Sequence, residues 1–231
     1  MIRGIIFDLD DTLYDYSFLE QEARNVIEQY AEQLLQIKKE LFREAVQIGK
    51  EKVKKQLPFV AAGHSRVLYY QKALEHLNYY PLSMALELEQ IYWDYFFQQM
   101  KLRKGVEELL NLIKKIGWKI SICTDLTTAI QLQKIRVLGL ERWIDCIVTS
   151  EEVGVEKPNS EIFCFCLEKM QLDRKEVIMV GDSLERDIKG AEKVGIQAIW
   201  YVNHKIEVQQ KERHMVENFT ELFEEVKCGK F

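Results

Sequence analysis

Three carboxylates follow a short apolar segment near the start of the chain. Residues 5–7 are Ile, Ile and Phe, and Asp8, Asp10, Asp11 and Thr12 follow them within five positions. Carboxylates gathered in this way repel one another, since two unit charges about 4 Å apart cost roughly 4 kcal/mol at an effective dielectric of about 20. A cation that binds there would remove this cost. The acidic cluster therefore predicts a site for Mg²⁺, which prefers oxygen ligands and often pairs with phosphate.

Two further apolar segments also end in polar residues. Residues 120–123 lead into Thr124 and Asp125, and residues 177–180 lead into Gly181, Asp182 and Ser183. Asp187 follows five positions after Asp182, and Lys157 lies in a separate connection after Val148. In parallel sheets, ligands bind beyond the carboxyl ends of the strands. We therefore expect all these polar side chains to meet at one edge of one sheet.

The elements that must position these residues alternate along the second part of the chain. Helical patterns cover residues 106–116, 129–138, 160–170 and 186–194, and apolar segments typical of strands cover residues 119–123, 144–148, 177–180 and 197–202. Glycines follow several of the helical patterns, where a left-handed residue often closes a helix. Such alternation predicts an α/β fold with a Rossmann-like, doubly wound parallel sheet.

Residues 17–99 interrupt this alternation and contain no segment typical of a strand. Their apolar residues keep helical spacing, which predicts an inserted α-helical bundle. We therefore expect a core domain formed by residues 1–16 and 100–231 and a helical domain formed by residues 17–99. The aromatic residues at positions 92, 93 and 95–97 are interpreted as bundle core, with a ligand pocket as the alternative.

These motifs, taken in order, resemble those of the haloacid dehalogenase-like hydrolase superfamily. The first motif matches Asp8, Asp10 and Thr12, the second matches Thr124, the third matches Lys157, and the fourth matches Gly181, Asp182 and Asp187. The resemblance covers essentially the whole chain. The helical insertion is similar to the α-helical cap of the subfamily related to phosphoglycolate phosphatases and some nucleotidases.

The resemblance implies a phosphatase that forms an aspartyl-phosphate intermediate. Asp8 would attack phosphorus, and Asp10 would act as general acid and base. Mg²⁺ would be held by the Asp8 carboxylate, the Asp10 main-chain carbonyl and Asp182, with Asp187 completing the outer shell or orienting Lys157. Thr124 and Lys157 would bind the transferring phosphoryl group.

Two positions depart from the pattern of the family. Asp125 and Arg186 stand where asparagine is common among its members. Because Asp125 adds a negative charge, its contribution to phosphate binding is expected from its backbone N–H.

The start of one predicted helix in the insertion suggests further contacts with the substrate. His64 and Arg66 are expected to face the substrate there, with Tyr14 or Tyr69 offering a ring edge or a hydroxyl. The alternative is that His64 and Arg66 are solvent-facing residues at a helix start.

Composition excludes several classes of partner. The net charge is −5 and the sequence pI is about 5.6, which argues against nucleic acid as a partner. No apolar stretch approaches the roughly 18 residues of a membrane span, and the acidic start argues against a secretion signal. The five cysteines are odd in number and lack CxxC spacing, which favours reduced thiols in the cytoplasm over a metal or redox site.

Other activities share the same core residues and stay open at this point. A phosphomutase would keep every motif residue, a dehalogenase would use Asp8 but leave Asp10 without an obvious task, and a phosphoryl-accepting module would be phosphorylated on Asp8 without turnover. The expected partner is a small phosphorylated metabolite, and the expected oligomeric state is a monomer or homodimer. The stretch after Asn203 indicates only charged residues followed by a terminal helix.

Overall fold

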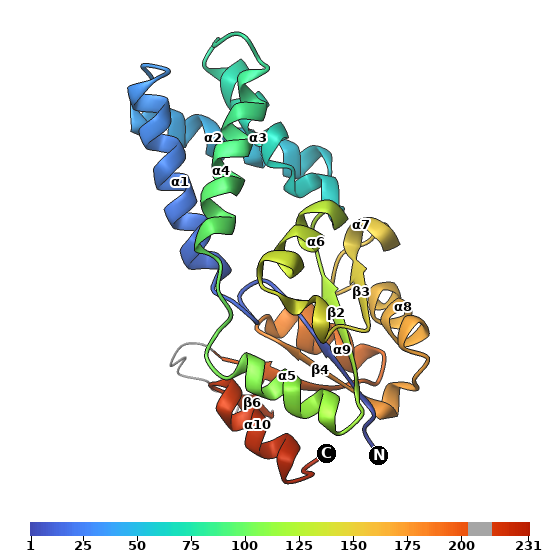
Figure 1. Ribbon diagram of the computed structural model, residues 1–231. Helices are drawn as coiled ribbons and strands as arrows, with labels where there is room; N and C mark the ends of the chain where they lie inside the picture. Colours follow the sequence, from blue (N-terminus) through green and yellow to red (C-terminus); the bar gives the residue numbers. More distant parts are fainter. Residues whose placement is uncertain (203–213) are drawn as a thin grey trace. The chain divides into compact units, whose positions relative to one another are not determined.

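The computed structural model describes residues 1–202 and 214–231. It separates the chain into two compact units. Met1–Asp15 and Lys101–Phe231 form one unit, and Tyr16–Met100 form the other. The first unit mixes strands and helices and the second is helical (Figure 1), and we name them the core unit and the helical unit.

A parallel sheet of six strands forms the centre of the core unit. In chain order the strands are β1 (Gly4–Phe7), β2 (Lys119–Thr124), β3 (Cys146–Thr149), β4 (Val177–Gly181), β5 (Gln197–Tyr201) and β6 (Met215–Val216). Their order across the sheet is β3-β2-β1-β4-β5-β6, and every neighbouring pair is parallel. The winding direction therefore reverses around β1, which lies between β2 and β4. Ligand sites of such sheets lie at this reversal, beyond the carboxyl ends of the strands.

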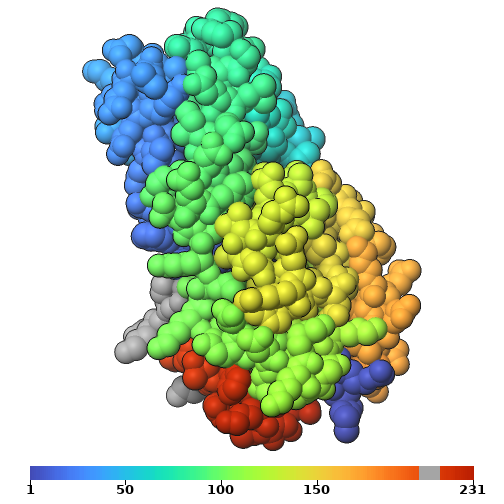
Figure 2. Space-filling model, in the orientation of Figure 1, coloured from blue at the N-terminus to red at the C-terminus, as the bar shows by residue number. Residues whose placement is uncertain are grey.

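Helices cover both faces of this sheet. They are α5 (Val106–Lys115), α6 (Thr128–Val137), α7 (Ser150–Val153), α8 (Ser160–Met170), α9 (Lys189–Lys193) and α10 (Phe219–Lys227). Ile6 of β1 belongs to a buried cluster with Phe163 of α8 and Ala191 of α9, whereas the ring of Phe7 lies 6.5 Å from that of Phe219 of α10. Because successive side chains of a strand point to opposite faces, α8 and α9 cover one face and α10 covers the other. Figure 2 shows the red residues of α10 against the green residues of α5, in agreement with their packing.

The predicted doubly wound α/β core is confirmed, with differences at the ends of elements. The strand expected over residues 144–148 is Cys146–Thr149. The helix expected over residues 186–194 is a π-helical segment, Leu184–Ile188, followed by α9. The expected terminal helix is present as α10, but β6 was not predicted because two residues are too few to show an alternating pattern. The charged stretch at residues 203–213 lies outside the described residues.

The helical unit consists of α1 (Tyr16–Gln33), α2 (Lys39–Gln56), α3 (Arg66–His76) and α4 (Met84–Gln99), with a 3₁₀ turn at Ala61–His64. Helix α1 packs on α2 and α4, and α3 packs on the same two helices. Figure 2 shows α1 and α4 side by side along one face of this unit. Tyr92, Trp93 and Phe96 are buried, as the core interpretation of the aromatic cluster predicts. Within the described ranges, no helix has the length and apolar character needed to cross a membrane.

Candidate active site

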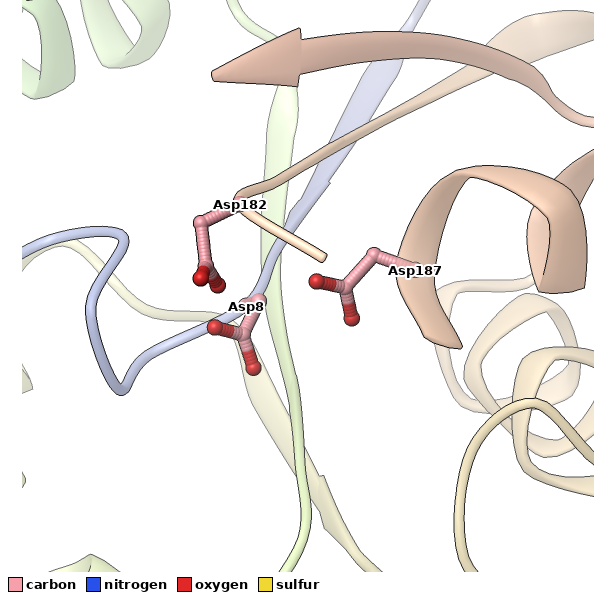
Figure 3. Close-up of side chains that lie close together, drawn as sticks. All are labelled: Asp8, Asp182 and Asp187. Carbon is pink, nitrogen blue, oxygen red and sulfur yellow. The ribbon is translucent and has the colours of Figure 1, made fainter. Parts of the chain in front are cut away.

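Three carboxylates from two strand ends converge in the core unit (Figure 3). Asp8 follows β1, Asp182 follows β4, and Asp187 lies in the π-helical segment after β4. One oxygen of each lies within 4.8 Å of the others. The backbone N–H of Asp8 donates to the carbonyl of Val180 over 2.9 Å, which ties the end of β1 to β4. The predicted meeting of residues 8, 182 and 187 at one sheet edge is therefore present.

Lys157 lies against two of these carboxylates. Its Nζ atom lies 2.5 Å from Oδ1 of Asp8 and 2.7 Å from Oδ1 of Asp187, and it donates to the carbonyl of Cys123 over 3.1 Å. Burial alone would lower the pKa of Lys157, but the Asp187 and Asp8 carboxylates outweigh burial and raise this pKa well above its ordinary value. The charged ammonium form of Lys157 is therefore favoured beside Asp8.

Ionisation of all three carboxylates is unfavourable in this cluster. Burial raises the pKa of Asp8 well above its ordinary value; Lys157 opposes this shift, and Asp187 and Asp182 add to it. Burial, with repulsion from Asp187 and Asp11, raises the pKa of Asp182 to about 6. If all three carboxylates ionise, they and the Lys157 ammonium group carry two net negative charges, which a divalent cation would balance. The oxygen donors are of the kind that Mg²⁺ prefers, so the residues present fit this ion.

The fourth motif is explained by close packing around Asp187. A Cβ atom at Gly181 would lie 2.5 Å from the Asp187 carboxyl group, so only glycine leaves room for that side chain. Oδ2 of Asp187 accepts from the backbone N–H of Ser183 over 3.0 Å, and the Ser183 hydroxyl accepts from the N–H of Arg186. These contacts hold the segment Leu184–Ile188 against the end of β4 and aim Asp187 at Lys157.

Thr12 links the first and fourth motifs. Its Oγ1 atom donates to Oδ2 of Asp8 over 2.9 Å and accepts from the backbone N–H of Asp182 over 3.1 Å. The turn before Thr12 is held by Arg103, which donates to the carbonyls of Asp11 and Thr12 over 3.0 and 3.1 Å.

Asp10 is held separately from the cluster of residues 8, 182 and 187. Lys134 of α6 lies 2.8 Å from both carboxylate oxygens of Asp10, and the Tyr14 hydroxyl donates to Oδ1 over 2.5 Å. Lys134 is fully buried. The Asp10 carboxylate is thus fixed by a partly buried ion pair, and a contribution of this residue to the metal site would come from its main-chain carbonyl, as the resemblance implies.

The end of β2 presents a hydroxyl to the same sheet edge. Thr124 is buried, and its Oγ1 atom accepts from Nε2 of Gln131 over 2.6 Å. The same amide nitrogen donates to the carbonyl of Asp125 over 2.6 Å. Gln131 therefore fixes both residues of the second motif.

The two departures from the family pattern contact each other. The Asp125 carboxylate pairs with the Arg186 guanidinium and accepts from the backbone N–H of Lys157 over 3.1 Å. Burial raises the pKa of Asp125, and Lys157 and Arg186 oppose this shift. The negative charge at position 125 is therefore met by the positive charge at position 186, and the side chain of Asp125 serves to position the Lys157 segment.

The residues predicted to recognise the substrate lie in different units. His64 and Arg66 belong to the helical unit, where Arg66 is buried, so the solvent-facing alternative is wrong for Arg66. Tyr69, also in the helical unit, donates its hydroxyl to the carbonyl of Gly63 over 2.6 Å. Tyr14 belongs to the core unit and donates to Asp10.

Lys134 and Gln131 were missed at the level of sequence, and the helix that carries them gives no clear signal for them. Gln131, Lys134 and Ile135 of α6 are buried, whereas the apolar residues Leu132 and Val137 of the same helix are exposed. Because apolar residues lie on both sides of this helix, its pattern does not mark the buried polar residues. Buried polar groups require partners, and the partners here are Thr124 and Asp10.

Comparison with known proteins agrees with this geometry. The model of a family described as haloacid dehalogenase-like hydrolase matches residues 2–195. The ribulose-1,5-bisphosphate 5-phosphatase of Halopiger xanaduensis is 38% identical over 203 residues, which cover 87% of this chain and 85% of that protein. The chain belongs to the haloacid dehalogenase-like hydrolase family.

Further similarity supports this family membership. The glyceraldehyde 3-phosphate phosphatase of Methanopyrus kandleri is 31% identical over 204 residues, covering 86% of this chain and 83% of that protein. The solved structure of the HAD-hydrolase YfnB from Bacillus subtilis, bound to magnesium, shares the fold of this chain, with a TM-score of 0.72 and 21% identity over 98% of this chain and 99% of that one. The protein is thus a hydrolase of the haloacid dehalogenase-like family, with the fold and the acidic cluster in place.

Proposed function

We propose that this hydrolase is a Mg²⁺-dependent phosphatase that acts on a small phosphate monoester through an aspartyl-phosphate intermediate. The observation that carries the proposal is the separate support of two carboxylates near one strand end. Asp8 lies in the acidic cluster beside Lys157, whereas Asp10 is held by Lys134 and Tyr14. One carboxylate is thus available as nucleophile and the other as acid and base.

The reaction divides into two steps at Asp8. In the first, an Asp8 oxygen attacks phosphorus, the bond to the leaving oxygen breaks, and Asp10, which enters the cycle in its protonated form, gives that oxygen a proton. In the second, water attacks the phosphorus of the aspartyl-phosphate and gives a proton to Asp10, the bond between Asp8 and phosphorus breaks, and Asp8 is regenerated with release of phosphate. Asp10 therefore ends the cycle in its starting state.

Positive charge is needed because a carboxylate and a phosphate dianion repel each other. Lys157 supplies a fixed ammonium group beside Asp8, and Thr124 supplies a hydroxyl at the end of β2. Held by Asp8, Asp182 and the Asp10 carbonyl, Mg²⁺ would supply further charge neutralisation. Asp187 orients Lys157 through their 2.7 Å contact.

The choice of phosphatase over related activities has two supports. Both curated relatives described above are named as phosphatases of small sugar-derived phosphates. A dehalogenase would have no use for the anchored Asp10, because a departing halide needs no proton. We therefore expect a small phosphorylated metabolite as substrate. The cytoplasmic location and the monomeric or homodimeric state stay predictions.

The proposal is tested by phosphate release from a panel of phosphate esters. The panel contains a generic aryl phosphate, sugar phosphates, nucleoside monophosphates and phosphoglycolate, each assayed with Mg²⁺ and with a chelator. We expect steady phosphate release with Mg²⁺ and its loss on chelation. Formation of an isomeric product without phosphate would indicate a mutase, and one phosphoryl group per protein without turnover would indicate a phosphoryl-accepting module.

Replacing Lys134 with methionine is expected to lower kcat by about 10²-fold with little change in KM. The reason is that Asp10 loses the ion pair that fixes it, and well-positioned acid–base catalysis contributes roughly 10²–10⁴-fold. Steady-state kinetics on the best substrate of the panel measure the effect. Lys114→Met is the matched control, since Lys114 forms an ion pair with Asp145 on the surface. An unchanged kcat in Lys134→Met would contradict the positioning role.

A further inference from the structure

The helical unit contains a cavity of its own, of about 710 Å³. This volume lies within the range of small-molecule sites, about 300–1,000 Å³. Its walls come from α1, α2, α3, α4 and the 3₁₀ turn, and all belong to the helical unit. Its basic lining residues are Arg24, Arg43, Lys50, Lys54, His64 and Arg66.

Arg66 is the buried cation of this cavity. Arg66 is only 8% exposed. Its Nη2 atom donates to the hydroxyls of Tyr16 and Tyr92 over 2.5 and 2.8 Å. The guanidinium carbon lies 4.2 Å from the centre of the Tyr92 ring and 4.5 Å from that of Trp93. No carboxylate of residues 1–202 or 214–231 forms an ion pair with it.

The hydroxyl partners do not neutralise Arg66. Burial raises the pKa of Tyr92 well above its ordinary value, and the opposing effect of Arg66 is smaller, so this phenol stays uncharged. A buried charge without a counter-ion is costly in free energy. The contacts hold the guanidinium in place but leave its charge available to an anion.

Lys50 of α2 adds a second cation to the same wall. Burial, together with the positive charge of Arg24, lowers its pKa, and Lys54 and Arg66 act in the same direction. The neighbouring Gly49 lies tightly against α3, since a Cβ atom there would be 2.5 Å from the carbonyl of Tyr69. Lys50 is therefore attached to a tightly packed part of the α2–α3 contact, and the positive charges of Arg24, Lys54 and Arg66 lie near its side chain.

The acidic residues of the cavity wall do not cancel this charge. Glu20, which also acts on Lys50, pairs with Arg24 over 2.5 Å, and Glu28 pairs with Arg43 over 2.6 Å. Glu40 and Glu44 are exposed to solvent. Within the described part of the chain, the lining cations Arg66, Lys50 and Lys54 have no carboxylate within ion-pair distance, and Lys54 is exposed to solvent, which leaves Arg66 and Lys50 as the two that are at least partly buried.

We propose that this cavity binds the phosphate group of a small organic phosphate through Arg66 and Lys50. A guanidinium and an ammonium group are the side chains that recognise phosphate oxygens, and the hydroxyl of Tyr16 adds a polar contact beside them. The phosphate could belong to the substrate, as a second phosphate group, or to a separate phosphorylated ligand. If the phosphate belongs to the substrate, the inference rests on the proposed function. If it belongs to a separate ligand, the inference is independent of that function.

Binding of inorganic phosphate in the presence of a chelator tests the site without relying on catalysis. Calorimetric titration of the metal-free protein is expected to show binding that weakens at least fivefold in Arg66→Gln and in Lys50→Gln. Lys55→Gln, an exposed position on α2 that does not line the cavity, should bind as the wild type does. Because Lys50 is partly exposed, its variant keeps the test valid if Arg66→Gln fails to fold. Equal binding by wild type and Lys50→Gln would overturn the proposal.

A kinetic comparison with Mg²⁺ identifies the source of the phosphate. The quantity to compare is the ratio of kcat/KM for a substrate with two phosphates, such as ribulose 1,5-bisphosphate, to kcat/KM for ribose 5-phosphate, which has one. If the second phosphate binds in the cavity, we expect Lys50→Gln to lower this ratio at least tenfold. If phosphate binding is lost in the variant but this ratio is unchanged, the site serves a separate phosphorylated ligand. Absence of any phosphatase activity would contradict the proposed function but would leave the calorimetric result standing.

Discussion

Asp8→Asn is expected to lower kcat for phosphate release by at least about 10⁴-fold, because the amide removes the nucleophile from a reaction that depends on covalent catalysis. The same variant should form no covalent phosphoryl adduct. Steady-state assays measure the first effect, and intact-mass measurement of acid-quenched protein during turnover measures the second.

The fold should tolerate this change. Burial, and repulsion from Asp187 and Asp182, already disfavour the ionised form of Asp8 in the metal-free protein. A neutral side chain of the same shape is therefore expected to leave the thermal unfolding temperature within a few degrees of the wild type.

The matched control is Asp94→Asn, an exposed acid on α4 that contacts Gln90. It should retain full activity. If Asp8→Asn kept more than a small fraction of the wild-type kcat, or still formed the adduct, Asp8 would not be the nucleophile.

The sequence predicted the sheet and the acidic cluster because both depend on local patterns. Apolar segments that end in polar residues mark the strands and their carboxyl ends, and the parallel order then brings Asp8, Thr124 and Asp182 to one edge. Gly181 was part of the motif, and the structure gives its reason, which is the space taken by Asp187.

Contacts that depend on helix orientation could not be predicted in the same way. Lys134 and Gln131 reach Asp10 and Thr124 only because α6 turns one polar stripe toward the sheet edge. The pairing of Asp125 with Arg186 also joins residues far apart in sequence. Two of these contacts balance charges that look out of place in the sequence. The buried Lys134 is balanced by Asp10, and the additional acid Asp125 is balanced by Arg186.

The same limit applies to the helical unit. The spacing of apolar residues predicted its helices, and Ser65 begins α3 by accepting from the N–H of Leu68. Arg66 at that helix start was interpreted as either solvent-facing or directed to a ligand. Its burial between aromatic rings depends on how α3 packs on α4, which periodicity does not determine.

Lys157→Met is expected to lower kcat by about 10³-fold and to destabilise the fold by about 3–5 kcal/mol, the usual effect of removing one partner of a buried ion pair. Lys157 contacts both Asp8 and Asp187, so the variant leaves these two buried carboxylates, and the half-buried Asp182 next to them, without the ammonium group that faces them. Kinetic assays and chemical unfolding measure the two effects. The control is Lys169→Met, since Lys169 forms a half-exposed ion pair with Glu152.

The destabilisation should depend on pH in a defined direction. In the metal-free wild type, Asp182 has a pKa of about 6 against an ordinary value of 3.8, so the folded protein binds more protons than the unfolded chain between these values. Stability therefore falls as pH rises through this window. Because Lys157 opposes the upward pKa shifts at Asp8 and Asp182, its removal should extend the window to higher pH and increase the loss of stability across it.

Chemical unfolding in the presence of a chelator at pH 5 and pH 7.5 measures this effect. The difference in unfolding free energy between the two pH values should be larger for Lys157→Met than for the wild type, and added Mg²⁺ should recover more stability in the variant. Equal pH dependence in the two proteins would mean that Lys157 does not neutralise the cluster, and the charge balance on which the metal site depends would then be wrong.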